Sequence, residues 1–324
     1  MSKTPNPFEN YVFSLSRTDF DLLKESINKR IDNEKYGFTS FEEAALHYSR
    51  KPICPNCGSN TYYKDGKTNA GFARYRCNEC DCSYTLLANS IFNSAKIPLH
   101  KLMNYIELMS FNVPLELMCE VVGIAKNTAE LWRKKIFNTV NDYQDHLLLS
   151  GNVWIDETYL EDYEVDAISN NKHLRGLSRS KICVVVAIDN HKNMVAIISG
   201  HGKPSSSRIC KALKSHIKEG STIIHDGEHS HYKLIEELHA SEEFYKANTK
   251  NKEYLEHMSL INNMCSWLKR YIRRFLGMDI NNLQSYLNWF IYLQRVKQYD
   301  EVWPKTTRIL RHLLLTNTKF TRKY

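Results

Sequence analysis

The sequence has 324 residues, 42% of them hydrophobic and 25% charged, which predicts two or three domains with a sizeable core. With only 12 glycines and 8 prolines, the fibrous and largely disordered classes are excluded. The chain carries 44 lysines and arginines against 36 aspartates and glutamates, so its net charge of +8 excludes an acidic solvating chain and favours a polyanionic partner.

Nothing in the sequence indicates export or membrane insertion. The first residues do not combine a basic segment with an apolar one, so no signal peptide is expected. Apolar stretches such as Ile182–Ile188 are much shorter than the roughly 20 residues of a membrane span. We therefore expect a cytoplasmic protein without a membrane partner.

A helical N-terminal region at residues 1–50 is followed by a cysteine cluster at residues 51–90. Two CxxC pairs, with nineteen residues between them, provide four thiolates: Cys54, Cys57, Cys77 and Cys80. Four thiolates on two tight turns suit tetrahedral Zn²⁺ and leave no open position for a substrate, so we expect a structural zinc. Short strands at 61–64 and 73–76 complete the pattern of a zinc ribbon. A redox dithiol is the less favoured alternative, and Cys82 is interpreted as a bystander.

Residues 91–148 are predicted to contain a helix-turn-helix that binds DNA. A helix over Pro114–Ile124 includes Gly123 near its end, and a second helix follows over Ala125–Ile136. The second helix offers basic side chains for phosphates or base edges: Lys126, Arg133, Lys134 and Lys135. An ordinary helical hairpin with a solvated basic face is the open alternative, although the neighbouring zinc ribbon and the net charge favour DNA.

Residues 149–300 alternate between strands and helices. Three apolar strands come first, the last two joined by a hairpin turn, and a helix, a strand and two further helices follow: 152–159, 182–189, 194–198, 205–217, 221–227, 231–238 and 262–276. This order indicates a mixed sheet flanked by helices, the architecture of ribonuclease-H-like nucleases. The predicted fold class is therefore α/β with several domains, and residues 301–324 form a basic C-terminal tail, either disordered or following DNA.

Two strands of this region are predicted to end in aspartates, Asp156 and Asp226. If the strands pair in parallel, the two carboxylates meet at one edge of the sheet and repel each other. Magnesium relieves this repulsion, because it prefers a few carboxylates together with phosphate oxygens. Two such ions about 4 Å apart activate a water or a 3′-hydroxyl for attack on phosphorus. The alternative is that the two aspartates are unrelated turn residues.

The motifs CPNCGS, YRCNEC, IDETY, HDGEHSHYKL and HMSLINNMCSWLKR, in this order from Lys51 to Lys297, resemble the DDE transposases of ISXO2-like insertion sequences. The resemblance implies an N-terminal zinc ribbon and a ribonuclease-H-like catalytic domain. It also implies that Asp156 and Asp226 are the first and second metal ligands of a two-magnesium site.

The third acidic ligand of this family falls on Asn262, which departs from the family pattern. Asparagine offers a neutral oxygen, so it can bind Mg²⁺ without adding charge. The resemblance implies a lysine seven residues later, and Lys269 fits because two helical turns place it on the same face as Asn262. Lys269 either contacts a substrate phosphate or belongs to a solvated basic face with Arg270, Arg273 and Arg274, which are further candidate DNA contacts.

Other conspicuous side chains receive structural interpretations. We expect His225, His229 and His231 to form hydrogen bonds at the rim of the site rather than to bind metal. Trp267 and Trp289 lie at helical spacing and are predicted to belong to the core rather than to a platform for stacking bases.

The sequence thus predicts a nucleoid-associated transposase that binds terminal inverted repeats of double-stranded DNA and cleaves and joins strands with Mg²⁺. Because two transposon ends must meet, we expect a homodimer or a larger synaptic complex. One alternative is a catalytically inactive, domesticated DNA-binding protein with a zinc ribbon. Another is a structure-specific nuclease that acts without transposon ends.

Overall fold

The computed structural model describes residues 6–161, 180–248, 250–275, 278–298 and 305–318. The chain forms two compact units. The first comprises Met1–Phe111, Glu116–Lys126 and Val302–Tyr324, and the second comprises Asn112–Leu115 and Asn127–Glu301. In the described residues no helix is long and apolar enough to cross a membrane.

Helices make up most of the first unit: α1 (Pro7–Ser14), α2 (Arg17–Tyr36), α3 (Phe41–His47), α4 (Leu99–Ser110), α5 (Leu115–Val122, from Glu116 on) and α13 (Lys305–Leu315). Ser16 and Ser40 cap α2 and α3, because their hydroxyls accept hydrogen bonds from the first turn, and Gly37 ends α2 with φ of 79°. The helical N-terminal region predicted from the sequence is therefore present.

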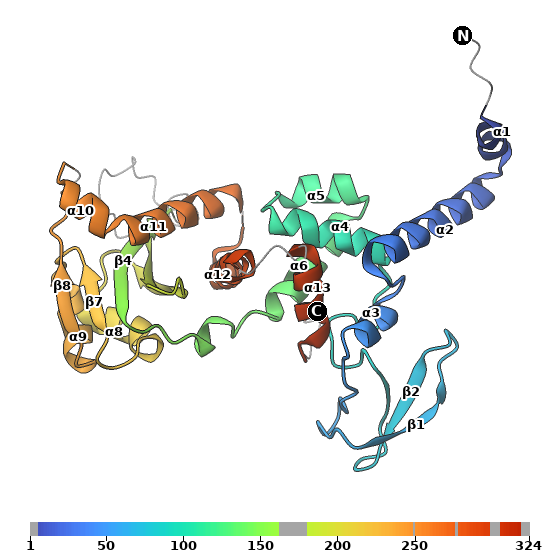
Figure 1. The fold of residues 1–324 in the computed structure, drawn as a ribbon, viewed down its shortest axis with the longest axis horizontal. Coiled ribbons are helices and arrows are strands. Elements are labelled where there is room, and N and C mark those ends of the chain that lie inside the picture. Colours follow the sequence, from blue (N-terminus) through green and yellow to red (C-terminus); the bar gives the residue numbers. More distant parts are fainter. Residues whose placement is uncertain (1–5, 162–179, 249, 276–277, 299–304, 319–324) are drawn as a thin grey trace, which may run out of the picture. The chain divides into compact units, whose positions relative to one another are not determined.

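The cysteine-rich segment forms an antiparallel sheet of three strands, β1 (Tyr62–Lys67), β2 (Ala73–Cys77) and β3 (Ser83–Thr85), in the order β1-β2-β3 (Figure 1). The two strands expected between the CxxC pairs are β1 and β2. β3 follows the second pair and was not predicted, because three residues are too few for a pattern of alternation.

Arg50 ties the C-terminal helix of the first unit to the chain that follows the cysteine-rich segment. Its buried guanidinium donates to the backbone carbonyls of Leu86, Asn89 and Leu314 and to the side-chain oxygen of Asn317. The apolar side of α13 is buried as well: Ile309, Leu310, Leu313 and Leu314. The region predicted as a basic tail therefore includes a packed helix, while residues 319–324 lie outside the described part.

The second unit is built on a mixed sheet of five strands in the order β6-β5-β4-β7-β8. The strands are β4 (Asn152–Leu160), β5 (Ile182–Asp189), β6 (Met194–His201), β7 (Thr222–His225) and β8 (Ser241–Phe244). β4 is central, antiparallel to β5 and parallel to β7. All eight residues of β5 are buried, as its uninterrupted apolar run predicts.

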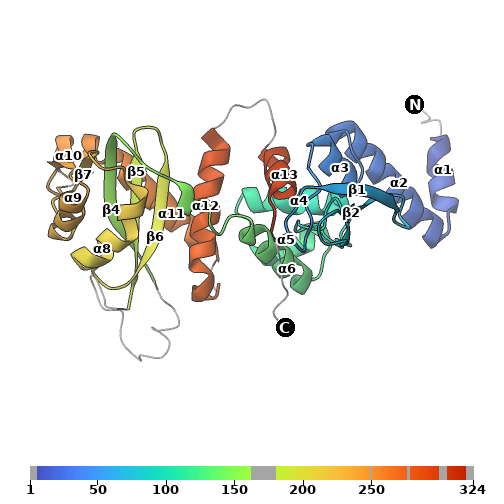
Figure 2. The same ribbon diagram turned by 90° about the horizontal axis from the view of Figure 1, so that it is seen from below.

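Helices cover both faces of this sheet (Figure 2). Alternate strand residues such as Val153, Ile155 and Val185 pack with α8 (Ser206–Leu213) and α9 (Tyr232–Glu237) in one core. The other face is covered by α11 (Ser259–Ile272) and α12 (Leu283–Gln298), with α10 (Lys252–His257) beside α11. The layers agree with the predicted ribonuclease-H-like architecture.

Two details of the sheet differ from the sequence-based prediction. β4 does not end at its carboxylates, because it continues to Leu160 through pairing with β5 as far as Ile182. The edge strand β8 was not predicted, because its four residues, SEEF, are all exposed and charged or polar except for the last.

Replacement of Arg50 by methionine should destabilise the first unit by about 3 kcal/mol, because three backbone carbonyls lose a charged donor while the volume is nearly kept. Thermal unfolding followed by circular dichroism measures the change. Arg311→Met, at an exposed position of α13, is the matched control. Equal melting temperatures of the two variants would contradict the role given to Arg50.

Candidate functional site

Asp156 lies on β4, and Asp226 directly follows β7, the strand that pairs with β4 in parallel. The paired residues of β4 and β7 are Asn152 with Thr222 and Trp154 with Ile224, a constant difference of 70 in residue number. Asp156 and Asp226 differ by the same 70, two positions past the last pair of the two strands, and the charge of Asp226 acts on Asp156. The parallel pairing on which the sequence prediction depended is thus present.

The pleat of the sheet separates these aspartates from their neighbours. Val153, Ile155 and Ile223 face the core under α8 and α9. Because side chains alternate between faces, Asp156 points to the other face, where the Cys265 thiol of α11 donates to it. His225 points to the α8 and α9 face by the same alternation, whereas Glu157 contacts the buried His231 and also lines the pocket beside α11.

The environment of Asp156 is unfavourable for a free carboxylate. Burial, together with the charges of Glu157 and Asp226, raises the pKa of Asp156 to about 6, against the opposing effect of a backbone hydrogen bond from Glu157. That bond, from the amide nitrogen of Glu157, measures 2.8 Å, and the Cys265 thiol donates to the other oxygen at 3.7 Å. Such a perturbed acid in a pocket is typical of functional sites.

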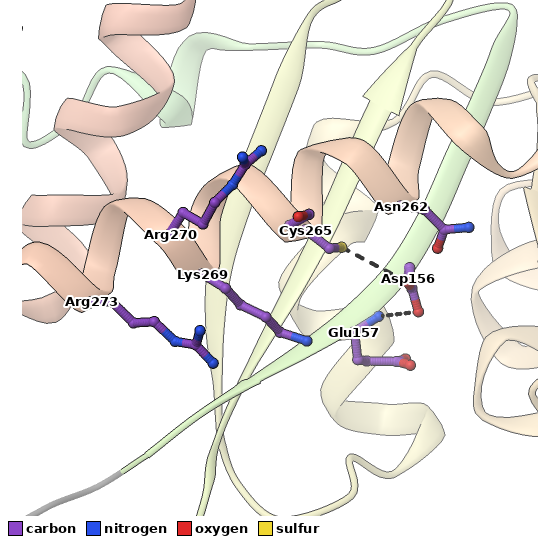
Figure 3. A pocket seen from close by; sticks show the side chains of 8 residues that line it. Asp156, Glu157, Asn262, Cys265, Lys269, Arg270 and Arg273 are labelled. Carbon is purple, nitrogen blue, oxygen red and sulfur yellow. Dashed lines mark hydrogen bonds between the residues drawn. The ribbon is translucent and has the colours of Figure 1, made fainter.

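α11 closes the site and carries its basic side. A pocket of about 320 Å³ is lined by Asp156 and Glu157 of β4 and by one side of α11 with the residue that follows it: Asn262, Cys265, Ser266, Lys269, Arg270 and Arg273. Figure 3 shows Asn262 beside Asp156 and Lys269 reaching toward Glu157, while the Arg270 guanidinium turns away. Asn262 and Lys269 therefore share a pocket with Asp156. Asp226 is not among the residues that line it, although its charge acts on Asp156.

A buried chain of hydrogen bonds runs behind the aspartates. Oε1 of Glu157 lies 2.8 Å from Nε2 of His231, and the Nδ1 atoms of His231 and His225 are 2.9 Å apart. Nε2 of His225 lies 3.0 Å from Oε1 of Glu242 on β8. Both histidine side chains are fully buried. The network links residues adjacent to the two aspartates with the edge strand.

Hydrogen-bond logic assigns the protons of this network. The backbone N–H of Gly227 donates to Nδ1 of His225, so that nitrogen accepts and the hydrogen of His225 lies on Nε2, toward Glu242. His231 must then donate from Nδ1. Burial and the neighbouring His231 lower the pKa of His225, in agreement with a neutral ring.

His225, Asp226 and His231 also offer ligand atoms within 4.8 Å of one another. The imidazole nitrogens, however, are used by each other and by glutamates, so hydrogen bonding is the better description. This agrees with the predicted chemistry of His225 and His231, but both are buried rather than at a rim. Sequence analysis missed Glu157, Glu242 and Cys265 as parts of the site. Only Glu157 carried a signal, by its place next to Asp156.

The four predicted zinc ligands lie together in the first unit. Ligand atoms of Cys54, Cys57, Cys77 and Cys80 all fall within 4.8 Å of one another. The sulfurs of Cys54 and Cys80 are 3.4 Å apart, and those of Cys57 and Cys77 are 3.5 Å apart. Cys82 is not part of this group. The donors suit a tetrahedral metal such as zinc.

The predicted helix-turn-helix corresponds to α5 and α6 (Lys126–Asn138), and Gly123 adopts φ of 66° between them. The boundary between the two compact units falls at this place, with α5 largely in the first unit and α6, after Lys126, in the second. The helix-turn-helix therefore stays a prediction.

One predicted DNA contact needs correction. Arg133 was assigned to the exposed face of its helix, but only 9% of it is exposed. Its guanidinium lies 5.6 Å from the Phe275 ring centre and donates to the Tyr286 hydroxyl at 3.4 Å, because α12 and the turn after α11 cover this side of α6. Lys126 and Lys134 are exposed, and Lys135 is half-buried over the Trp132 ring. Arg270, Arg273 and Arg274 are exposed, as expected.

Asp156→Asn should stabilise the metal-free protein by about 3 kcal/mol above pH 7, since a pKa raised by about two units disfavours the charged folded form. The stability of the wild type that comes from protonated Asp156 is complete below pH 3.8 and is lost as pH rises through about 6. The advantage of the variant should therefore shrink as pH falls from 7 toward 4. Thermal unfolding in a chelator measures it.

Asp189→Asn is the control, because this replacement is expected to lower the stability of the fold rather than raise it. The Asp189 carboxylate is fully buried but accepts hydrogen bonds from the backbone of Ser150, His191 and Asn193 and from the Asn193 amide. Its replacement should destabilise the fold. If both variants lowered the melting temperature at pH 7 equally, Asp156 would be an ordinary structural carboxylate.

The comparison with known proteins agrees with this geometry. No curated protein matches the chain. Residues 148–294, which contain β4 to β8, α11 and the carboxylates, match the family described as the ISXO2-like transposase domain. This part of the chain is therefore an ISXO2-like transposase domain, as the sequence motifs indicated.

Proposed function

We propose that the protein is an insertion-sequence transposase that binds the terminal inverted repeats of its element and catalyses magnesium-dependent DNA strand cleavage and transfer. The observation that carries this proposal is that Asp156 on β4 feels the charge of Asp226, which directly follows the parallel strand β7, with Asn262 and Lys269 in the same pocket as Asp156. The family of residues 148–294 supports it.

The donors of the site fit magnesium. Asp156 and Asp226 offer carboxylate oxygens and Asn262 an amide oxygen, which are the atoms that Mg²⁺ prefers. The raised pKa of Asp156 indicates that the protein leaves its charge poorly compensated, as expected where a cation completes the site. When bound, magnesium would activate the attacking water or 3′-hydroxyl and stabilise the leaving oxygen.

The protein's own residues would orient the DNA strand. Lys269 would bind a phosphate oxygen at the mouth of the pocket through its ammonium group, with Arg273 beside it. The Glu157–His231–His225–Glu242 network would hold the segment around Asp226 in place, because Gly227 donates directly into it. Asp156 is fixed by the central strand of the sheet.

The cysteine-rich segment and the predicted helix-turn-helix would hold the DNA ends. We propose a structural zinc on Cys54, Cys57, Cys77 and Cys80, and DNA contacts from Lys126, Lys134 and Lys135 of a helix-turn-helix. Two ends must meet in one complex, so a dimer or larger assembly is part of the proposal. A catalytically inactive DNA-binding protein is the second candidate, because Asn262 stands where the family pattern has an acid.

Purified protein should contain one zinc per chain, and Cys77→Ser should lose it while Cys82→Ser keeps it, because Cys82 lies outside the four-sulfur group. Zinc content by mass spectrometry and the melting temperature measure both effects. Loss of a structural zinc should markedly lower the stability of the first unit. Equal zinc content in the two variants would refute the assignment of ligands.

With Mg²⁺ or Mn²⁺, the protein should nick a duplex that carries the inverted repeat flanking its gene. Asp156→Ala and Asp226→Ala should each reduce cleavage at least about a hundredfold, because the metal loses a carboxylate, while binding of the duplex persists. Denaturing gels measure cleavage, and gel shifts measure binding.

Glu256→Ala, at an exposed position of α10, is the control and should cleave normally. Wild-type protein that shifts the duplex but does not nick it would favour the inactive DNA-binding protein. Binding should also weaken steeply with salt if phosphate contacts dominate.

A further inference from the structure

Trp267 has an unusual position on α11. The sequence pattern assigned it to the core, but 47% of it is exposed, whereas Trp289 is 2% exposed and Trp132 4%. The buried side of α11 is complete without it: Ile261, Met264, Cys265, Leu268 and Tyr271. A lysine or glutamine would suit an exposed helix position as well, so packing alone does not account for a tryptophan here.

Trp267 lies next to the basic side of the pocket. Arg270 follows it by three residues, which is about one helical turn, and Arg270 also lines the pocket that contains Asp156. In Figure 3 the Arg270 guanidinium turns away from Asp156 and over the helix. Arg270 thus forms a link along the helix surface between the pocket and the indole ring.

The positive charge of this surface favours a nucleic-acid partner. The fourteen residues of α11 contain no acidic side chain, and Lys269 and Arg270 lie in its last turn. Arg273 follows directly and also lines the pocket. A protein partner with an apolar patch would have to desolvate these cations without compensation. A nucleic-acid strand offers phosphates that bind the cations and base faces that stack on the ring.

We propose that Trp267 stacks on an unpaired base of the DNA, a few nucleotides from the phosphate that occupies the pocket. In an intact duplex both faces of a base are covered by its neighbours, so an indole ring finds a free face only on an unpaired or extruded base. Arg270 holds the phosphate between the pocket and the stacked base. Trp267 is then a positioning residue that recognises opened DNA beside the cleavage point.

This inference rests on the proposed function but is tested separately from it. Full-length protein is titrated, in Ca²⁺ or chelator, with two versions of the inverted-repeat end: one fully paired, one with three unpaired nucleotides beside the cleavage point. Trp267→Ala should weaken binding of the unpaired version about tenfold and leave the paired version nearly unchanged. Trp267→Phe, which keeps an aromatic face, should retain most of the affinity.

A 2-aminopurine placed among the unpaired nucleotides gives a direct readout. Its fluorescence should be quenched by the indole ring on binding to the wild type, and much less with Trp267→Ala. Leu255→Ala, at a position of α10 that is 46% exposed, should behave like the wild type. Unchanged melting of Trp267→Ala excludes misfolding as the cause.

Three results would overturn the stacking role. Equal affinity and equal quenching for wild type and Trp267→Ala, with cleavage intact, would reject stacking and leave the proposed function standing. A change of oligomeric state in Trp267→Ala without a change in DNA affinity would make this surface a protein interface. Absence of DNA binding by the wild type would reject the proposed function itself.

Discussion

The main electrostatic constraint on the second unit is the repulsion between the carboxylates of Asp156, Glu157 and Asp226. β4 and β7 pair in parallel and lead to Asp156 and Asp226, and burial together with the charges of Glu157 and Asp226 raises the pKa of Asp156 to about 6. Such an arrangement is unfavourable for the protein alone and favourable around a cation. The side chains that pack near Asp156 are consistent with this constraint. α11 contributes only neutral and basic side chains to the pocket that contains Asp156.

Behind the aspartates, hydrogen bonds to histidines rather than a metal satisfy the carboxylates of Glu157 and Glu242. Glu157 and Glu242 lie at the two ends of a chain of histidines, His231 and His225, whose protons are ordered by a single backbone donor, Gly227. A buried network of this kind is stable only when every member is satisfied. Because Glu157 and His225 directly adjoin Asp156 and Asp226 in sequence, the network holds the backbone around the two aspartates in place.

Much of this arrangement could be predicted from the sequence, for identifiable reasons. The apolar run of β5, the CxxC spacing and the strand before Asp226 are local signals, and the family motifs located Asn262 and Lys269. Arg133 and Trp267 were misplaced because both lie near the boundary of a helix face, where periodicity does not decide burial. The covering of Arg133 by Phe275 and Tyr286 comes from residues more than a hundred positions away. Glu242 joined the network only through the short, charged strand β8.

Asn262 is best understood together with the charges around it. The pocket is lined by two acids, Asp156 and Glu157, and by three cations, Lys269, Arg270 and Arg273. Of these two acids, Glu157 is hydrogen-bonded to the buried His231, whereas Asp156 accepts from the Glu157 amide and the Cys265 thiol. An aspartate or glutamate at position 262 would hold a cation more firmly but would attract a phosphate less. In the proposed function, asparagine keeps an oxygen ligand while the basic side of α11 draws the DNA strand, so substrate and metal would complete the site together rather than metal first.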